Sequence, residues 1–430
     1  MSTNRLLERL KKKDKKGLFS SSNSDISYAT GFLPLDYRNG YMMECTDEND
    51  VVVDSYPSIG IVGGSMVTIV GKSATAKTTF AMQMAAAIIK PFPDGLTVHF
   101  DLERATNYSR IKAVTGLSQS DMGTRYILKK DQGYIEDIME TIMDIAHMKE
   151  SYKEDFMYDT GLKDEFGKPL HAYVPTVIII DSIPSLCSTP ETITDKETKA
   201  KLEKLEVGGS MSRNRDVQKI SDMYMKLMGP LKQYNITVIT INHIKQKLDI
   251  NPFAKSQAQV MWLKQDESLP GGNASIYYAN NIFKFVSVGG GKKTMEDDGF
   301  DGFTIRCELI KSRTNKAGQS CTLIYNQSTG FDPILSLFEF AKEHGLMGGS
   351  RKNARYFIGH EDVKFNEKEF VNEFITRQEV RYALHNVTIP LLNSQLSVVD
   401  HDSVNKMQQS IGEMVISGEM EASEGSIPSA

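Results

Sequence analysis

The stretch from Met66 to Lys90, MVTIVGKSATAKTTFAMQMAAAIIK, decides the fold class. Its first residues, Met66–Val70, are apolar and partly β-branched, which is typical of a strand buried on both faces of a sheet. A polar loop follows, and apolar residues then recur at helical spacing through Thr78–Lys90. A strand, a tight loop and a helix in this order form the first half of a β-α-β unit, so we expect an α/β protein.

The same alternation continues along the chain. The helical period of Ile135–Lys149 separates further strand candidates, and runs this apolar require helices on both faces of the sheet. The sequence therefore predicts a mainly parallel central sheet. The polar stretch Ser151–Val174 is expected to be an insertion on a loop, with no chemistry of its own. The further strand candidates are Leu96–Phe100, Thr176–Ile180, Thr237–Ile241, Ile282–Val288 and Thr304–Ile310.

The composition is that of an ordinary globular protein. The 430 residues include 50 Lys and Arg against 55 Asp and Glu, which gives a net charge of −5 and excludes a polycation. The four cysteines form no Cys-x-x-Cys pair, so we expect neither a disulfide framework nor a zinc ribbon, and a reducing, cytoplasmic setting. No apolar run approaches the roughly 20 residues of a membrane span, so no membrane partner is expected.

Local charge divides the chain into parts. Residues 1–17 hold seven Lys or Arg and two acidic residues, whereas residues 400–430 hold six acidic residues and one Lys. The basic arm is either a solvated helix or a segment that docks on a partner subunit or a phosphate backbone. The expected parts are a basic arm and linker at 1–24, an N-terminal segment of the core at 25–60, the core at 61–335, a small C-terminal α+β domain at 336–399 and an acidic flexible tail at 400–430.

The loop Gly71–Thr78 stands where a phosphate-binding loop is expected, between a strand and a helix. Lys77 would reach the β and γ phosphates of a nucleotide, and the Thr78 hydroxyl would bind Mg²⁺. The strict pattern has Gly before the Lys, where this chain has Ala76. The alternative is a turn with a surface lysine. The candidate nucleotide contacts are Gly71, Lys72, Ser73, Ala74, Thr75, Ala76, Lys77, Thr78 and Thr79.

Carboxylates follow two of the strand candidates. Asp181 ends the apolar run that begins at Thr176, where it could support the metal ion, although buried strands also end in Asp merely as a turn former. Glu103 comes just after the run that ends at Phe100, where it could polarise the water that attacks the γ-phosphate. A helix-capping carboxylate is the alternative for Glu103.

These residues, taken in order, resemble the RecA family of DNA strand-exchange ATPases. The order is a phosphate loop, then Asp101-Leu102-Glu103, Asp181-Ser182 and Ile241-Asn242-His243-Ile244. The resemblance is closest to the UvsX-like recombinases of large bacteriophages, which also lack the Gly before the loop Lys and also have Asn-His after the strand. It covers residues 60–335. It implies a RecA-like P-loop ATPase core with a small N-terminal polymerisation arm, and ATP and Mg²⁺ as cofactors.

Two later segments strengthen the resemblance. Pro270–Ala274 is similar to the Gly-Gly-Asn-Ala signature that closes the family's second DNA-facing loop, and Lys311-Ser312-Arg313 is similar to the basic pair that a neighbouring subunit inserts against the γ-phosphate. The resemblance implies that Lys311 and Arg313 act in trans. It also implies that His243 senses the γ-phosphate. At the family's adenine-stacking position the chain has Arg110, so Tyr108 is the candidate.

The DNA-facing candidates come from two places in the chain. The segment from Lys245 to Pro270 carries dispersed cations together with Phe253 and Trp262, a composition that can follow a phosphate backbone and stack on bases. A flexible surface insertion is the alternative. Residues after Gly208-Gly209 occupy the place of the family's first DNA-facing loop. The candidates are Arg213, Lys219, Ser221, Lys245, Lys247, Gly271, Gly272 and Asn273.

The resemblance implies an ATP-dependent recombinase, a DNA-dependent ATPase, in the cytoplasm of an infected bacterial host. Its partners would be single-stranded DNA, homologous double-stranded DNA, further copies of itself in helical filaments, a loading mediator and a single-strand-binding protein. Two alternatives remain open. One is a hexameric helicase or translocase built on the same core. The other is a weakly hydrolysing, ATP-switched mediator that binds DNA as a scaffold.

Overall fold

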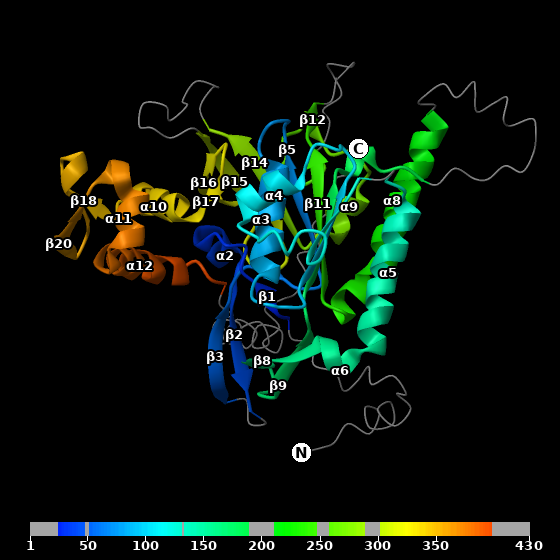
Figure 1. The fold of residues 1–430 in the computed structure, drawn as a ribbon, viewed down its shortest axis with the longest axis horizontal. Coiled ribbons are helices and arrows are strands. Elements are labelled where there is room, and N and C mark those ends of the chain that lie inside the picture. The colour runs from blue at the N-terminus through cyan, green and yellow to red at the C-terminus, as the bar shows by residue number, and fades with distance from the viewer. Residues whose placement is uncertain are drawn as a thin grey trace, which may run out of the picture. The chain divides into compact units, whose positions relative to one another are not determined.

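The computed structural model describes residues 25–47, 51–130, 133–188, 210–246, 258–288 and 302–397, with the side chains of 210–214 left aside. The expected basic arm at 1–24 and acidic tail at 400–430 lie outside these ranges. The described residues up to Leu396 form one compact unit. At its centre is a mixed sheet, flanked by helices and by smaller sheets (Figure 1).

The described residues place nine strands in the central sheet, in the order β17-β16-β15-β14-β5-β11-β10-β6-β7. The six from β14 to β7 pair in parallel, and β15 to β17 continue the sheet antiparallel. The predicted α/β fold with a mainly parallel core is confirmed. The strands are β5 (Met66–Gly71), β6 (Leu96–Asp101), β7 (Tyr126–Lys129), β10 (Thr176–Asp181), β11 (Ile236–His243), β14 (Asn281–Ser287), β15 (Gly302–Ser312), β16 (Gln319–Asn326) and β17 (Gly330–Asp332).

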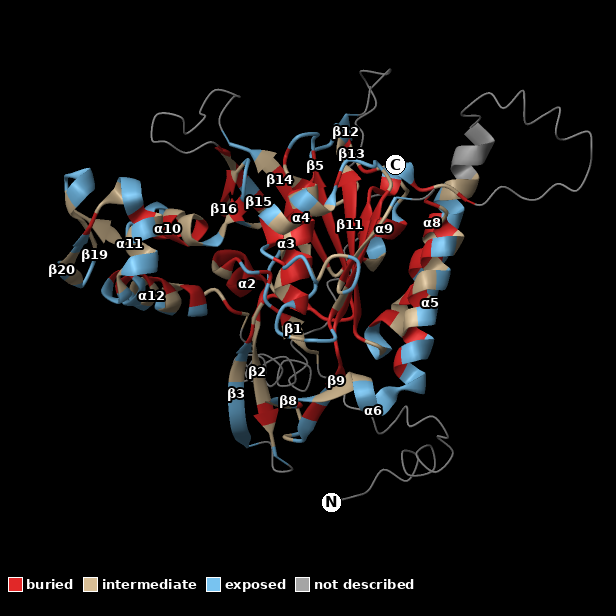
Figure 2. Cartoon of the chain, in the orientation of Figure 1, coloured by how far each residue is buried: buried red, intermediate tan, exposed pale blue. Residues whose placement is uncertain are grey.

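The strands bury their two faces against different helices. In β10, Val177 and Ile179 join the apolar cluster under α3 (Lys77–Ile89) and α4 (Tyr108–Thr115). The alternate residues Ile178 and Ile180 join a second cluster under α5 (Ile135–Ser151) and α8 (Ser210–Gln233). Side chains alternate between faces along a strand, so an unbroken apolar run is needed to fill both layers. Figure 2 shows the resulting buried centre.

Aromatic rings fill the layer beneath α3. Phe80 is fully buried, and its ring centroid lies 5.0 Å from that of Phe285, 5.3 Å from that of Phe32 and 5.5 Å from that of Phe331. These partners come from an N-terminal segment, β14 and β17, so one ring joins three distant parts of the chain. The N-terminal segment contains β1 (Ser27–Tyr28), α2 (Leu33–Asn39) and β4 (Ile61–Val62).

The prediction of a loop at Ser151–Val174 is wrong. The segment forms α6 (Lys153–Phe156) and an antiparallel hairpin of β8 (Met157–Lys163) and β9 (Pro169–Tyr173). It contacts a second hairpin, β2 (Tyr41–Thr46) with β3 (Val52–Ser58), where the Tyr56 hydroxyl donates to the Lys163 carbonyl at 2.9 Å. In β9, Leu170, Ala172 and Tyr173 are buried while Pro169 and His171 are exposed, so the strand has no continuous apolar run in the sequence.

The C-terminal part is an α+β unit, as expected. It consists of α10 (Pro333–Glu343), β18 (Met347–Gly348), β19 (Arg355–Phe357), β20 (His360–Phe365), α11 (Phe370–Thr376) and α12 (Gln378–Asn393). Its core is built around Phe338, whose ring stacks on Phe370 at 3.9 Å. Within the described ranges, every helix is too short or too polar to cross a bilayer.

We predict that Phe80→Ala lowers the free energy of unfolding by about 3–5 kcal/mol, because truncating a fully buried ring leaves a cavity among its three aromatic partners. The shift in the chemical denaturation midpoint measures this loss. Met148→Ala is the control, since Met148 is 53% exposed and should change the midpoint little. Equal shifts for the two variants would contradict the assignment of Phe80 to the core.

Candidate functional site

The phosphate-binding-loop candidate connects the carboxyl end of β5 to α3. Gly71 has no room for a side chain, because a Cβ there would lie 2.9 Å from the Phe285 carbonyl oxygen. Ala74 and Ala76 adopt left-handed backbone angles, with φ of 61° and 58°. Alternating left- and right-handed residues turn successive N–H groups toward one side, which creates an anion-binding concavity. The backbone thus takes this conformation without the Gly that the strict pattern has before the lysine.

Lys77 begins α3 and is 5% exposed. Its Nζ donates to the Lys72 carbonyl at 2.7 Å, which holds the ammonium group within the loop. Burial lowers the pKa of Lys77 to about 8, although the nearby carboxylates of Asp181 and Glu103 oppose this effect. The site therefore contains a buried cation beside two anions, a combination suited to a phosphate group.

Thr78 and Asp181 meet at the same edge of the sheet. The Thr78 hydroxyl donates to Asp181 Oδ2 at 2.6 Å, and Asp181 is 4% exposed. Burial raises the pKa of Asp181 to about 7, against the hydrogen bond from Thr78, which lowers it. A hydroxyl and a carboxylate are the hard oxygen ligands that Mg²⁺ prefers, and a cation there would offset the cost of the buried carboxylate. The two residues therefore fit a Mg²⁺ site.

Glu103 lies beside Ser182 and His243. The Ser182 hydroxyl donates to Glu103 Oε1 at 2.7 Å, and His243 Nε2 lies 3.2 Å from the same oxygen. Burial alone would raise the pKa of Glu103, but the hydrogen bonds from Ser182 and His243 outweigh it and leave the pKa below its ordinary value. Glu103 is therefore held as a carboxylate by two polar neighbours, and its side chain remains 40% exposed.

Parallel register brings these residues together. Asp181 of β10 lies opposite Asp101 of β6, and His243 of β11 lies opposite Gly71 of β5. Asp101 also shapes the turn that carries Glu103, because its carboxylate accepts hydrogen bonds from the backbone N–H groups of Ala105 at 3.1 Å and Thr106 at 2.8 Å. The sequence alone gives Ser182 no role in binding Glu103, although its position directly after Asp181, at a strand end, is a signal.

Tyr108, the candidate for stacking on adenine, makes contacts within the protein. Its hydroxyl accepts from the Leu128 backbone N–H at 3.3 Å, and its ring packs against the cluster beneath α3. Arg110, at the family's stacking position, donates to the Gln327 and Ser328 carbonyls instead. The adenine-stacking role of Tyr108 stays a prediction. Thr79, another predicted nucleotide contact, is 7% exposed.

Lys311 and Arg313 lie away from the phosphate-loop edge. Lys311 donates to the carbonyls of Ile276 and Tyr277, and Arg313 donates to the Tyr277 carbonyl at 2.6 Å. Burial and the neighbouring Arg313 lower the pKa of Lys311 to about 8. The Arg313 N–H donates to the Asn280 carbonyl, and Asn280 in turn donates to the carbonyl of Met66, the first residue of β5. The amino and carboxyl ends of β5 are about 15 Å apart, so the structure does not bring this pair to Lys77.

Four DNA-facing candidates share one cavity of about 250 Å³: Ser221, Gly271, Gly272 and Asn273. Gly271 and Gly272 have φ of 85° and 76°, a conformation that favours glycine. Among the other candidates, Lys245 is exposed on the short strand β12 (Lys245–Gln246), and Lys219 forms an ion pair with Glu136 at 3.1 Å. The Arg213 side chain and all of Lys247 lie outside the described residues.

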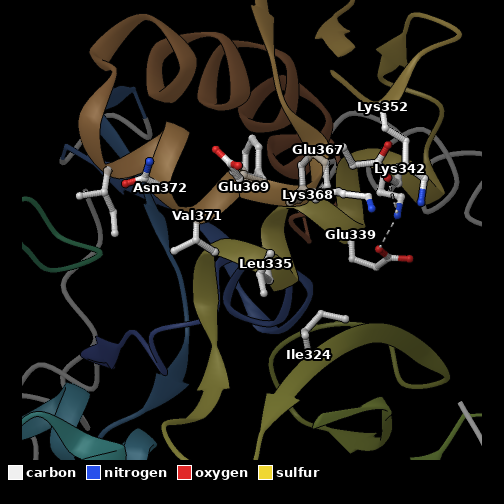
Figure 3. A pocket seen from close by; sticks show the side chains of 13 residues that line it. Ile324, Leu335, Glu339, Lys342, Lys352, Glu367, Lys368, Glu369, Val371 and Asn372 are labelled. Atoms are coloured by element: carbon white, nitrogen blue, oxygen red, sulfur yellow. Dashed lines mark ion pairs between the residues drawn. The ribbon is translucent and has the colours of Figure 1, made fainter. Parts of the chain in front are cut away.

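A second cavity, of about 500 Å³, lies in the C-terminal part between α10, the turn Glu367–Glu369 and α11 (Figure 3). Its floor is apolar, with Ile324 and Leu335, and its rim carries charges of both signs, including the Lys342–Glu339 ion pair at 3.3 Å. It contains none of the predicted site residues. We therefore place the candidate chemistry at the sheet edge rather than in this larger cavity.

Comparison with known proteins gives three similar curated proteins, each described as RecA. No protein-family model matches the chain. RecA of Leptospira meyeri is 21% identical over 330 residues, which cover 76% of this chain and 69% of that protein. RecA of Aquifex aeolicus is 22% identical over 344 residues, 79% of this chain and 82% of the relative.

RecA of Syntrophus aciditrophicus is 21% identical over 323 residues, 73% of this chain and 75% of that protein. All three similarities extend over about three quarters of the chain, so they are not confined to the phosphate loop. Together with a mainly parallel sheet whose carboxyl edge gathers the predicted nucleotide residues, they support a distant relationship of this protein to the RecA family.

Proposed function

We propose that this protein is an ATP-dependent recombinase that polymerises on single-stranded DNA, pairs it with a homologous duplex and exchanges strands. The observation that carries the proposal is the gathering of Lys77, the Thr78–Asp181 pair and the Glu103–Ser182–His243 group at one edge of the sheet. The finer assignment, to the UvsX-like recombinases of bacteriophages acting in an infected host cell, rests on Ala76 and on the Asn242-His243 pair.

In this proposal the site hydrolyses ATP. The backbone N–H groups of the loop and the Lys77 ammonium bind the phosphates, because they supply positive charge where the transferred phosphoryl group is most negative. Mg²⁺, held by Thr78 and Asp181, would neutralise charge on the phosphate oxygens. Glu103, kept ionised by its hydrogen bonds, orients the attacking water and accepts its proton. His243 contacts Glu103 and leads into the DNA-facing segment, so it can report whether the γ-phosphate is present.

Lys311 and Arg313 complete the site of a neighbouring subunit. Their position near the amino end of β5 supports action in trans. The phosphate loop of the same subunit follows the carboxyl end of β5, so the length of that strand separates the pair from it. A patch at one end that completes a site at the other end makes a head-to-tail contact, which generates a helical filament unless the rotation closes a ring. ATP bound between subunits would then stabilise the assembled state.

DNA would bind along the surface formed by the glycine cavity and the segment after His243. The Gly271 and Gly272 backbone can approach phosphates closely, and Lys245 supplies an exposed cation. Repetition of this surface along a filament multiplies the phosphate contacts, so an acidic net charge of −5 is compatible with DNA binding. A loading mediator and a single-strand-binding protein are further proposed partners.

We predict that Lys77→Ala and Lys311→Ala each abolish DNA-stimulated ATP hydrolysis, and that an equal mixture of the two regains about a quarter of the wild-type rate. In a head-to-tail assembly, about one interface in four joins an intact loop to an intact Lys311. Steady-state phosphate release measures the rates.

The matched control mixes wild-type protein with the Lys77→Ala/Lys311→Ala double variant. Wild-type neighbours then also meet at about a quarter of the interfaces, so the two mixtures should agree. An inactive mixture of the single variants beside an active control mixture would contradict action in trans. Electron microscopy on single-stranded DNA with a non-hydrolysable ATP analogue tests the filament itself, and closed rings would favour the helicase alternative.

We predict that Ser182→Ala shifts the acid limb of the kcat profile to higher pH by about one pH unit, because a hydrogen bond to a charged group stabilises the carboxylate. Loss of the Ser182 hydroxyl raises the pKa of Glu103, so Glu103 becomes protonated at a pH where the wild type is still ionised. The ATPase rate measured from about pH 3.5 to pH 8 under saturating Mg²⁺ and ATP tests this, because the pKa of Glu103 in the wild type lies below its ordinary value. Ser185→Ala, at a nearby exposed serine, should leave the profile unchanged.

A further inference from the structure

A buried ion pair lies outside the nucleotide site. Lys284 of β14 donates to Glu267 Oε2 at 2.8 Å, and the two side chains are only 6% and 8% exposed. The same Glu267 oxygen accepts a hydrogen bond from the Lys264 backbone N–H at 3.1 Å. These partners keep the pKa of Glu267 below its ordinary value although burial would raise it. A charge this deeply buried needs its partner, so the two strands that carry the pair are held in one arrangement.

Glu267 belongs to a small two-stranded sheet made of β12 and β13 (Glu267–Ser268), which we call the neck. The short strand β12 pairs antiparallel with β13, with Lys245 opposite Ser268 and Gln246 opposite Glu267. The chain between β11 and α9 (Ala274–Tyr278) contains both neck strands, so their pairing holds the outgoing and returning parts of this connection side by side. On the returning side, Leu263 and Leu269 pack against Val70 and Ile282. The neck is therefore fixed to the central sheet by apolar packing as well as by the ion pair.

Each strand of the neck has its own connection to the phosphate loop. On the β12 side, the Ile244 N–H donates to the Gly71 carbonyl at 3.2 Å, directly after His243. On the β13 side, Glu267 binds Lys284, which lies opposite Val70 in the parallel register of β14 and β5. Val70 immediately precedes Gly71, the first residue of the loop. A change at the loop can therefore reach the neck by two independent routes.

We propose that the Glu267–Lys284 pair is a positioning contact that transmits nucleotide binding at the phosphate loop to the segment carrying Trp262, along a route separate from His243. The inference rests on the proposed function, because it needs a nucleotide at this loop. Both neck strands must follow β5 if residues 258–268, which include Trp262, are to respond to the loop, and the pair supplies the directional attachment of the second strand. Without it, β12 keeps its hydrogen bond to the loop, whereas the returning strand keeps only the non-directional packing of Leu263 and Leu269, so the response to nucleotide binding weakens.

Trp262 is a built-in reporter of this movement. It is the single tryptophan in the sequence and is 47% exposed. Its ring lies against Gly318 in the turn between β15 and β16, since a Cβ at Gly318 would lie 2.6 Å from Trp262 Cζ2. A shift of the segment relative to that turn changes the solvent contact of the indole and hence its emission. The readout requires neither DNA nor hydrolysis.

The test uses the double variant Glu267→Gln/Lys284→Met, which removes both charges together and so leaves no unpaired charge in the interior. Binding of a fluorescently labelled, non-hydrolysable ATP analogue gives the nucleotide affinity. In a separate titration with the unlabelled analogue, Trp262 emission gives the response of the segment. We expect the affinity to stay within about threefold of the wild type, while the emission change falls at least about fivefold. The charge-swapped variant Glu267→Lys/Lys284→Glu should regain part of the response.

Asp54→Asn is the matched control, since it breaks the exposed Asp54–Lys163 pair on the two hairpins and should change neither readout. Thermal unfolding checks that each variant is folded. A double variant that binds nucleotide and keeps the wild-type Trp262 response would overturn the inference. If wild-type protein bound no nucleotide, the proposed function itself would fail, which is a distinguishable result. Equal loss of the response in Asp54→Asn would also overturn the inference, because the effect would not be specific to the buried pair.

Discussion

The parallel pairing of β5, β11, β10 and β6 is the constraint on which the candidate site depends. Because these strands run in one direction, the residues that follow them emerge at one edge, although Gly71, Asp101, Asp181 and His243 are far apart in sequence. The strands can be parallel only if crossover helices cover both faces, and the apolar runs fill both layers. The site is thus a consequence of how the core is buried.

Concentrating polar groups at a buried edge has an energetic cost, and the local contacts show how it is offset. The Thr78 hydroxyl satisfies Asp181, the Lys72 carbonyl satisfies Lys77, and Ser182 satisfies Glu103. The raised pKa of Asp181 and the lowered pKa of Lys77 indicate that this compensation is incomplete. Both groups would gain from a ligand that brings a metal cation to the carboxylate and phosphate to the ammonium, so the same incomplete compensation favours binding.

The sequence predicts six of the nine strands that the described residues place in the central sheet, together with α3 and α5, because apolar runs and the 3.6-residue period report burial directly; β7, β16 and β17 have no counterpart among the predicted strands. It was insufficient where a side chain's partner comes from a distant element. The sequence makes Lys219 a DNA-facing candidate, but α5 provides Glu136 as its partner at 3.1 Å, and only the fold shows that the Ser182 hydroxyl donates to Glu103. The hairpin within Ser151–Val174 is not predicted because its strands are partly exposed and polar residues interrupt their apolar alternation.

The substitution of Ala76 for the usual glycine follows from the same physics. An alanine in the left-handed region costs about 1 kcal/mol relative to glycine, since only a methyl group must be accommodated. Ala76 directly precedes α3, whose thirteen residues include ten that are buried, so the packing of α3 far exceeds this local cost. A strained residue can persist where the surrounding core determines its conformation. The departure from the strict phosphate-loop pattern therefore carries little weight against nucleotide binding, whereas loss of the packing beneath α3 would remove the loop conformation itself.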